Sequence, residues 1–326
     1  MASLFIDRRG TDLQLRQGCV RIESAGSVST VPLSMVERVV LSAPAAISSP
    51  LLAELAARCI PLAILAPHGH RTSSVLPPAC GTDGARRVAQ YRAYLDPEWR
   101  RRWSARILRG KLAGQLHTLS AAAQQRPELR QFLEAASASM RETARRLAQS
   151  PPPPLPELRG IEGAAAAAFF GAYARLFAPA LAFHGRNRRP PRDPVNAALS
   201  LAYTLVYAES VRAAAAAGLD PLIGFYHDLH PGRQSLACDL CELERGAVEL
   251  WTWTLFRDRV IRLEHFHVHK GRCLLGKAGR RSFYLAIEPL LEQTGKRQRR
   301  RCLALVRSLD RQEQDGWEFE HENPDS

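Results

Sequence analysis

Two glutamates and one histidine are the side chains of this sequence best suited to chemistry. They are Glu162 in RGIEGAAAAAFFGAY, His227 in GLDPLIGFYHDLHPGR and Glu242 in SLACDLCELER. Two carboxylates and one imidazole can hold a divalent cation, and mostly oxygen ligands suit Mg²⁺ or Mn²⁺ better than Zn²⁺. The chain also carries a formal net charge of +13, which attracts polyanions. Together these features predict a metal-dependent nuclease or strand-transfer enzyme.

A further acid, Asp239, lies three residues before Glu242 on a predicted helix, so that both side chains lie on one helix face. A pair with this spacing is more often a solvated acidic face. Here the flanking leucines and the nearby His227 favour a shared pocket. Glu162 is predicted in the first turn of its helix, where an acid also suits the helix dipole without any function.

Arginine clusters offer a surface for phosphate groups, although any single charge run is usually a solvated face. A nine-residue loop without acids, HGRNRRPPR, carries four arginines, and two more basic groups lie at 100–111 and 296–301. The predicted DNA-binding residues are Arg186, Arg188, Arg189, Arg192 and Arg233.

Two other motifs are weaker signals for a metal. Cys238 and Cys241 form a C-x-x-C pair without a second pair, so we expect them to pack and to bind no zinc. His265, His267 and His269 alternate as on one face of a strand, where surface or phosphate-facing histidines are more common than a metal cluster.

The elements that must position these residues predict an α+β multidomain fold. A small amino-terminal β-rich domain, 1–82, contains short apolar segments between turn residues, a helix after Ser48-Ser49-Pro50 and a buried strand in IPLAILA. A larger all-α catalytic domain, 83–310, contains predicted helices at 97–125, 127–149, 160–180, 194–217 and 235–260, and a polyproline connector at 150–156. We expect the acidic tail, 311–326, to be disordered.

The amino-terminal segment, the hydropathy and the cysteine count indicate the cellular compartment. The start MASLFIDRRG lacks the apolar stretch of a signal peptide, and no window reaches the roughly 18 apolar residues of a membrane span. Seven cysteines, an odd and scattered number, do not resemble a disulfide framework. We therefore expect a cytoplasmic protein without a membrane partner.

Taken together, the sequence resembles a known family, the CRISPR-associated spacer-acquisition integrase, a metal-dependent endonuclease. The segments RGIEGAAA, HGRNRRPPRDPVNAALSLAYTLVYAE and GLDPLIGFYHDLHPGRQSLACDLCELER are similar to its catalytic signatures in order and spacing, while LFIDRRGTDLQL is similar to its β domain, less specifically. The resemblance places metal ligands at Glu162, His227 and Glu242 and an accompanying acid at Asp239. The two cysteines and the acidic tail depart from the family pattern.

The resemblance also implies a reaction and partners. A homodimer would join a small ferredoxin-like CRISPR-associated protein, capture short double-stranded DNA, and insert it as a spacer into the repeat of a CRISPR array. The 3′-hydroxyl of the captured strand would attack a phosphodiester, and water would replace it in hydrolytic nicking. Two alternatives stay open: a non-catalytic DNA-binding module whose acids are structural, and a general repair nuclease acting on branched DNA.

Overall fold

A computed structural model describes residues 2–65, 74–76, 83–148, 150–187 and 190–321, with side chains for 3–65, 83–148, 150–187 and 190–311. The chain divides into two compact units. Unit 1 comprises 1–93, 207–223 and 295–326, and unit 2 comprises 94–206 and 224–294. Segments far from the amino terminus pack in unit 1, so the predicted domain limits at 82 and 310 stay a prediction.

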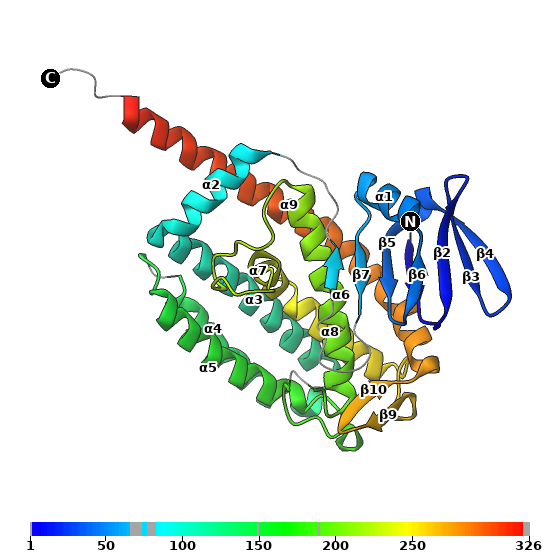
Figure 1. Ribbon diagram of the computed structural model, residues 1–326. Coiled ribbons are helices and arrows are strands. Elements are labelled where there is room, and N and C mark those ends of the chain that lie inside the picture. The colour runs from blue at the N-terminus through cyan, green and yellow to red at the C-terminus, as the bar shows by residue number, and fades with distance from the viewer. Residues whose placement is uncertain (1, 66–73, 77–82, 149, 188–189, 322–326) are drawn as a thin grey trace. The chain divides into compact units, whose positions relative to one another are not determined.

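The amino-terminal part of unit 1 contains two small sheets, as the alternating apolar segments predict (Figure 1). In the first, β1 (Ala2–Ile6), β5 (Val36–Leu41) and β7 (Leu62–Ile64) are parallel and β8 (Ser74–Leu76) is antiparallel. In the second, β4 (Ser27–Pro32), β3 (Cys19–Ser24) and β2 (Thr11–Arg16) are antiparallel neighbours, and β6 (Ala45–Ile47) pairs in parallel with β2.

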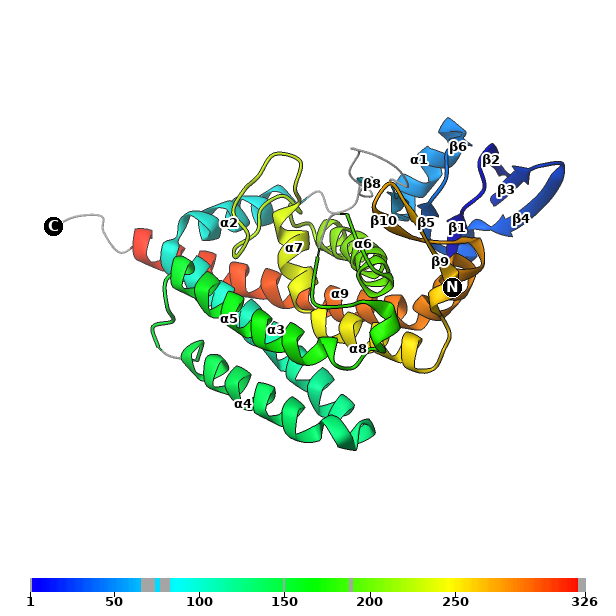
Figure 2. The ribbon, with the colours of Figure 1, turned by 90° about the horizontal axis from the view of Figure 1, so that it is seen from below.

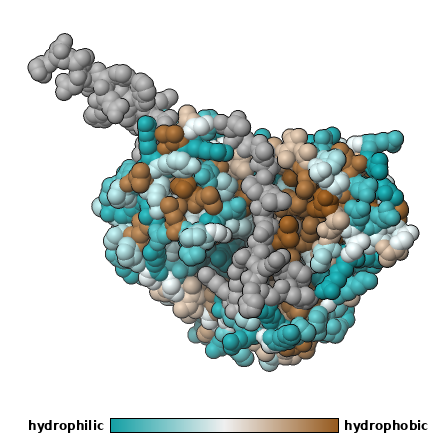
Figure 3. Space-filling model, viewed as in Figure 1, coloured by the Kyte–Doolittle hydropathy of each residue, from teal (hydrophilic) through white to brown (hydrophobic). Residues whose placement is uncertain are grey.

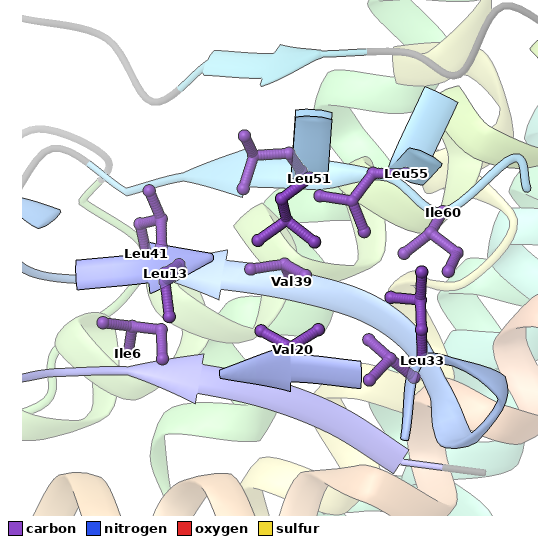
Figure 4. Packing of buried hydrophobic residues seen from close by; sticks show 11 residues of the cluster. Ile6, Leu13, Val20, Leu33, Val39, Leu41, Leu51, Leu55 and Ile60 are labelled. Atoms are coloured by element: carbon purple, nitrogen blue, oxygen red, sulfur yellow. The ribbon is translucent and has the colours of Figure 1, made fainter. Parts of the chain in front are cut away.

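A single hydrophobic core holds these sheets together (Figure 4). Leu13 and Val20 of the second sheet lie near Val39 of the first, and helix α1 (Ser49–Ala57) contributes Leu51 and Leu55. Because successive strand residues alternate between faces, this core explains why apolar residues recur at every second position of these strands.

A buried ion pair joins the sheet of unit 1 to the second half of helix α6 (Pro194–Ala216). Arg38 on β5 donates from Nε to Glu209 Oε1 at 2.6 Å, and Arg212 donates to the other carboxylate oxygen at 2.7 Å. Arg38 is 4% exposed and Glu209 is fully buried. Burial opposes ionisation of Glu209, but Arg38 and Arg212 outweigh it and lower the pKa of this carboxyl. A buried charge of this kind needs its partner, because an unpaired one is strongly destabilising.

Unit 2 is built on the long helix α3 (Pro97–Gln125), which packs against α4 (Arg130–Arg146), α5 (Leu155–Ala174), α7 (Ser235–Glu242) and α8 (Arg245–Arg257). Figures 1 and 2 show α3, α4 and α5 running side by side. The predicted start of α3 is confirmed, since the Asp96 side chain accepts hydrogen bonds from the amides of Glu98 and Trp99. A hairpin of β9 (Phe266–His269) and β10 (Arg272–Leu275) completes this unit.

Two predicted helices around the candidate site differ in the structure. Helix α5 begins at Leu155, not at 160, because Pro156 is accepted within the first turn, so Glu162 lies about two turns into the helix. The helix predicted at 235–260 is two helices, α7 and α8, separated at Leu243 and Glu244. The break lets α8 cross α3 at a glycine pair: a Cβ built on Gly246 would lie 2.1 Å from the carbonyl carbon of Gly114.

Two further expectations need correction. Residues 311–321, expected to be disordered, continue helix α9 (Lys277–His321), because the segment RQEQDGWEFEH contains two Gln and three Glu residues, which are good helix formers, and no proline. Cys59 is disulfide-bonded, which the scattered cysteine pattern does not predict. The remaining helix, α2 (Gly84–Leu95), precedes α3. Among the described residues, no helix is both long and apolar enough to span a membrane.

Candidate active site

The carboxylates of Glu162 and Glu242 meet at one ammonium group. Lys111 on α3 donates a hydrogen bond to Glu162 Oε1 on α5 and lies 2.7 Å from Glu242 Oε2 at the end of α7. The side chains of Lys111 and Glu242 are 7% and 5% exposed, whereas that of Glu162 is 23% exposed. Three helices therefore place two predicted metal ligands within reach of a single cation.

Arg245 is the second cation at this site. It donates to Glu242 at 2.8 Å, and its guanidinium lies over the ring of Tyr203, 4.4 Å from the ring centre. Burial of Glu242 favours its neutral form, but the charges of Arg245 and Lys111 outweigh burial and hold its pKa well below the ordinary value. Glu242 is therefore ionised at neutral pH, as a metal ligand must be.

His227 is held by Asp239. The imidazole Nδ1 lies 2.7 Å from Asp239 Oδ1, and the two Asp239 oxygens also accept hydrogen bonds from the backbone amides of Phe225, Tyr226 and His227, at 2.5, 3.0 and 3.0 Å. Asp239 is 1% exposed. With Nδ1 bonded to a carboxylate, Nε2 is the nitrogen that can bind a cation, an arrangement typical of histidine ligands. Asp239 thus positions His227 and its loop.

Asp228, the residue after His227, ties the same loop to two helices. Its carboxylate accepts hydrogen bonds from Arg100 on α3 and from Arg159 on α5, and both contacts are ion pairs. Arg100 also donates to the carbonyl of Phe225 at 2.8 Å. Because α5 carries Glu162, these contacts set where the His227 loop lies relative to that carboxylate.

A cavity of about 300 Å³ lies beside Glu162 and the two cations that contact Glu242, Lys111 and Arg245. Its lining residues are Lys111, Gln115, Glu162, Ala166, Ala167, Phe170, Arg186, Arg245 and Glu249. Glu249 is fully buried, and it accepts hydrogen bonds from Tyr203 at 2.8 Å and from Gln115 at 3.1 Å. Burial raises the pKa of Glu249 more than the neighbouring Arg245 lowers it.

The structure thus brings together some of the predicted site residues and not others. Glu162 and Glu242 share Lys111, and His227 pairs with Asp239. Within the described part of the chain, no three or more His, Cys, Asp or Glu side chains form one cluster suited to a metal. The nearest metal-like arrangement is therefore the pair of carboxylates around an ammonium group.

The predicted DNA-binding arginines have different environments. Arg186 lines the cavity and donates to Asn196 and Ser200, at 2.7 and 3.1 Å, so it also braces the start of α6. Arg233 donates to the carbonyl of Asp228 in the His227 loop. Arg192 is exposed, and Arg188 and Arg189 lie outside the described residues. DNA contact by these arginines stays a prediction.

The two weaker motifs lie as follows. Cys238 and Cys241 lie on α7 and are not disulfide-bonded, and burial raises the pKa of Cys238 to about 11. His267 and His269 are exposed on β9, whereas His265 lies in the turn before that strand and accepts from the amide of Arg262 at 3.2 Å.

Sequence reasoning missed three contributors to this site. Lys111 lies in the basic segment 100–111, for which the sequence predicts phosphate contact, and the sequence motifs do not include Arg245 or Glu249. A signal existed for Arg245, because a cation three residues after Glu242 faces it whenever the backbone is helical. Lys111 and Glu249 had no such signal, since their partners lie on other helices.

Comparison with known proteins identifies the family and the fold. The family model described as CRISPR associated protein Cas1 matches residues 4–289. The chain is 34% identical over 309 residues to CRISPR-associated endonuclease Cas1 1 of Thermodesulfovibrio yellowstonii, covering 92% of this chain and 93% of that protein. A CAS1 protein from Thermotoga maritima has the same fold, with a TM-score of 0.82 at 21% identity over 95% of this chain and 97% of the other. A casposase bound to integration product gives 0.77 at 21% identity, covering 90% and 82%.

Proposed function

The chain belongs to the CRISPR-associated Cas1 family, and we propose that it inserts short DNA duplexes into a CRISPR array from a metal centre at Glu162, His227 and Glu242. It is a DNA endonuclease and integrase of CRISPR adaptation. The convergence of Glu162 and Glu242 on one cation is the single observation that supports this centre best. A solvated acidic face would not place a buried carboxylate, Glu242, and a partly buried one, Glu162, around a buried ammonium group.

The donor set fits Mg²⁺ or Mn²⁺. Glu162 and Glu242 would supply oxygen ligands and His227 would supply Nε2. The Lys111 ammonium already contacts both carboxylates, so the two acids lie close enough to share one cation. When bound, the ion would polarise the phosphate and lower the pKa of the attacking hydroxyl. Asp239 would act through His227, as a positioning residue and not as a ligand, because its oxygens already accept four hydrogen bonds.

The remaining residues would orient DNA and neutralise its charge. The reaction is a transesterification, in which the 3′-oxygen of the captured strand forms one bond to phosphorus as the repeat strand's bond to phosphorus breaks. Arg245 keeps Glu242 ionised, and the cavity beside Glu162 gives the phosphate access. Arg192 and Arg233, on exposed or half-buried loops, are candidates to contact the DNA backbone.

We also infer that the protein acts as a homodimer with a small ferredoxin-like partner, and that the dimer forms through its amino-terminal β domain. Figure 3 shows hydrophobic residues gathered over α1 and β7 on the face in view. Leu52 belongs to α1 and Ile64 to β7, and they are 39% and 40% exposed. Exposed apolar groups on a strand-rich surface are typical of protein interfaces. Light scattering of the wild type and of Leu52→Asp tests this inference, and a dimer unaffected by the charge would place the interface elsewhere.

A strand-transfer assay tests the proposed function. The purified chain and its partner protein are incubated with a labelled duplex and a plasmid containing the repeat, in Mg²⁺, in Mn²⁺ or in EDTA. Glu162→Gln and Glu242→Gln should abolish joining, while duplex binding and the unfolding midpoint change little for Glu162→Gln. Glu142→Gln, an exposed acid on α4, is the control and should retain full activity. Joining that persists in EDTA, or in Glu162→Gln, would remove the metal centre from the mechanism.

A further inference from the structure

Lys111 is a buried lysine whose ammonium contacts two carboxylates at once. It comes from the middle of α3, and its ammonium lies between carboxylates from α5 and α7. Lysine is rarely buried at this depth without a dedicated counter-ion. Here it has two, and both are the acids proposed to bind the metal.

The site is electrically neutral before a metal ion binds. Glu162 and Glu242 contribute two negative charges, while Lys111 and Arg245 contribute two positive ones. A divalent ion added to the same oxygens would leave a net charge of about +2 in a site where the side chains of Lys111 and Glu242 are 7% and 5% exposed. Like charges that close repel strongly in a medium of low polarity. Binding of the ion is therefore favourable only if the ammonium moves away.

The cavity offers the ammonium a place to go. Lys111 and Glu162 both line it, so the side chain can leave the carboxylates by rotating about its own bonds, without moving α3. Glu249 and Gln115 line the same cavity, and both side chains carry oxygen atoms that can accept a hydrogen bond from an ammonium group. Gln115 Oε1 is buried and accepts no hydrogen bond among the described residues, so it is an acceptor ready for a donor.

We propose that Lys111 is a built-in competitor of the catalytic metal ion: its ammonium and the divalent cation exchange at Glu162 and Glu242, and the displaced ammonium moves into the adjoining cavity. This inference rests on the proposed metal centre. Lys111 keeps the two carboxylates together and, with Arg245, balances their charge. It weakens metal affinity because the ion must displace a charge-assisted contact. Lys111 is thus a positioning residue that sets the concentration of metal at which the site assembles.

Metal binding, measured without DNA, tests this directly. Mn²⁺ is titrated into the full chain at fixed pH, and free Mn²⁺ is counted by electron paramagnetic resonance. Binding that Glu162→Gln abolishes is assigned to this site, which separates it from weak sites such as the exposed histidines of β9. Lys111→Met keeps the length of the side chain and removes the charge, so the site should bind Mn²⁺ about tenfold more tightly or better. Lys111→Arg keeps the charge and should stay close to the wild type.

Arg109→Met is the matched control, since Arg109 is an exposed cation on the same helix. It should leave the Mn²⁺ affinity unchanged, which excludes a general effect of net charge. If Lys111→Met does not fold, Lys111→Gln removes the same charge and keeps a hydrogen-bond donor. Equal or weaker Mn²⁺ affinity in the uncharged variants overturns the competition. If neither the wild type nor those variants bind Mn²⁺ at a site sensitive to Glu162, the metal centre itself is wrong and the inference fails with it.

Discussion

Replacing Asp239 by alanine should both destabilise unit 2 and disable catalysis. The carboxylate accepts three backbone hydrogen bonds and holds the His227 ring, and it is 1% exposed. Each buried donor left without an acceptor costs about 1 to 3 kcal/mol, but water entering the new space would satisfy some of them. A total near 3 to 6 kcal/mol follows, which corresponds to a fall in the unfolding midpoint on the order of 10 °C.

Thermal unfolding, followed by circular dichroism, and the strand-transfer assay measure the two effects. Asp258→Ala is the control, because Asp258 is exposed and pairs with the adjacent Arg257; it should shift the midpoint very little. Asp239→Asn keeps the shape but places an amide NH₂ against backbone donors, so it should also lose activity. A midpoint unchanged in Asp239→Ala, or near-normal strand transfer by that variant, would refute the assignment of Asp239 as the residue that orients His227.

Three further predictions concern packing, charge and DNA. Glu209→Ala should lower the stability of unit 1 by about 3 to 5 kcal/mol, because it removes the buried carboxylate that both Arg38 and Arg212 contact. Glu54→Ala, in an exposed pair, should have little effect, and urea unfolding compares the two variants. The pKa of Glu209 is lower in the folded protein than in the unfolded chain, so ionised Glu209 stabilises the fold above its unfolded pKa. That stabilisation is lost as the pH falls through the folded-state pKa. Glu209→Gln should therefore make the free energy of unfolding depend less on pH in acid. Gly246→Ala should destabilise unit 2 by about 1 to 3 kcal/mol or more, because its Cβ would meet the backbone of Gly114, while Gly171→Ala meets nothing within 4 Å and should be neutral or stabilising. Arg192→Ala should reduce the slope of log affinity for duplex DNA against log salt by about 1, and an unchanged slope would exclude a phosphate contact at that residue.

The sequence predicts the elements better than their contacts. The strands, the first helix and the Asp96 cap follow from local patterns that the chain carries on its own, namely alternation, proline and capping acids. The break between α7 and α8 could not be predicted in this way. It accompanies the close crossing of two glycines, Gly114 and Gly246, that are 132 positions apart and recognisable only in the folded chain.

The candidate site shows the same limit. Residue types and the family resemblance predict Glu162, His227, Asp239 and Glu242, and the structure places these in two pairs. Glu162 and Glu242 come together at Lys111, which lies 51 residues before Glu162. In the sequence, Lys111 belongs to a basic segment of mostly arginines. No local pattern distinguishes a lysine that faces DNA from one that turns inward between two acids.

The location of a bound Mn²⁺ ion tests whether Glu162, His227 and Glu242 form the metal centre. Anomalous scattering from a crystal grown in Mn²⁺ reports where the ion lies without reference to activity. We expect a peak bounded by the carboxylates of Glu162 and Glu242 and by Nε2 of His227, with the Lys111 ammonium displaced from both acids. A peak elsewhere, for example at His267 and His269, with Lys111 still between Glu162 and Glu242, would contradict it.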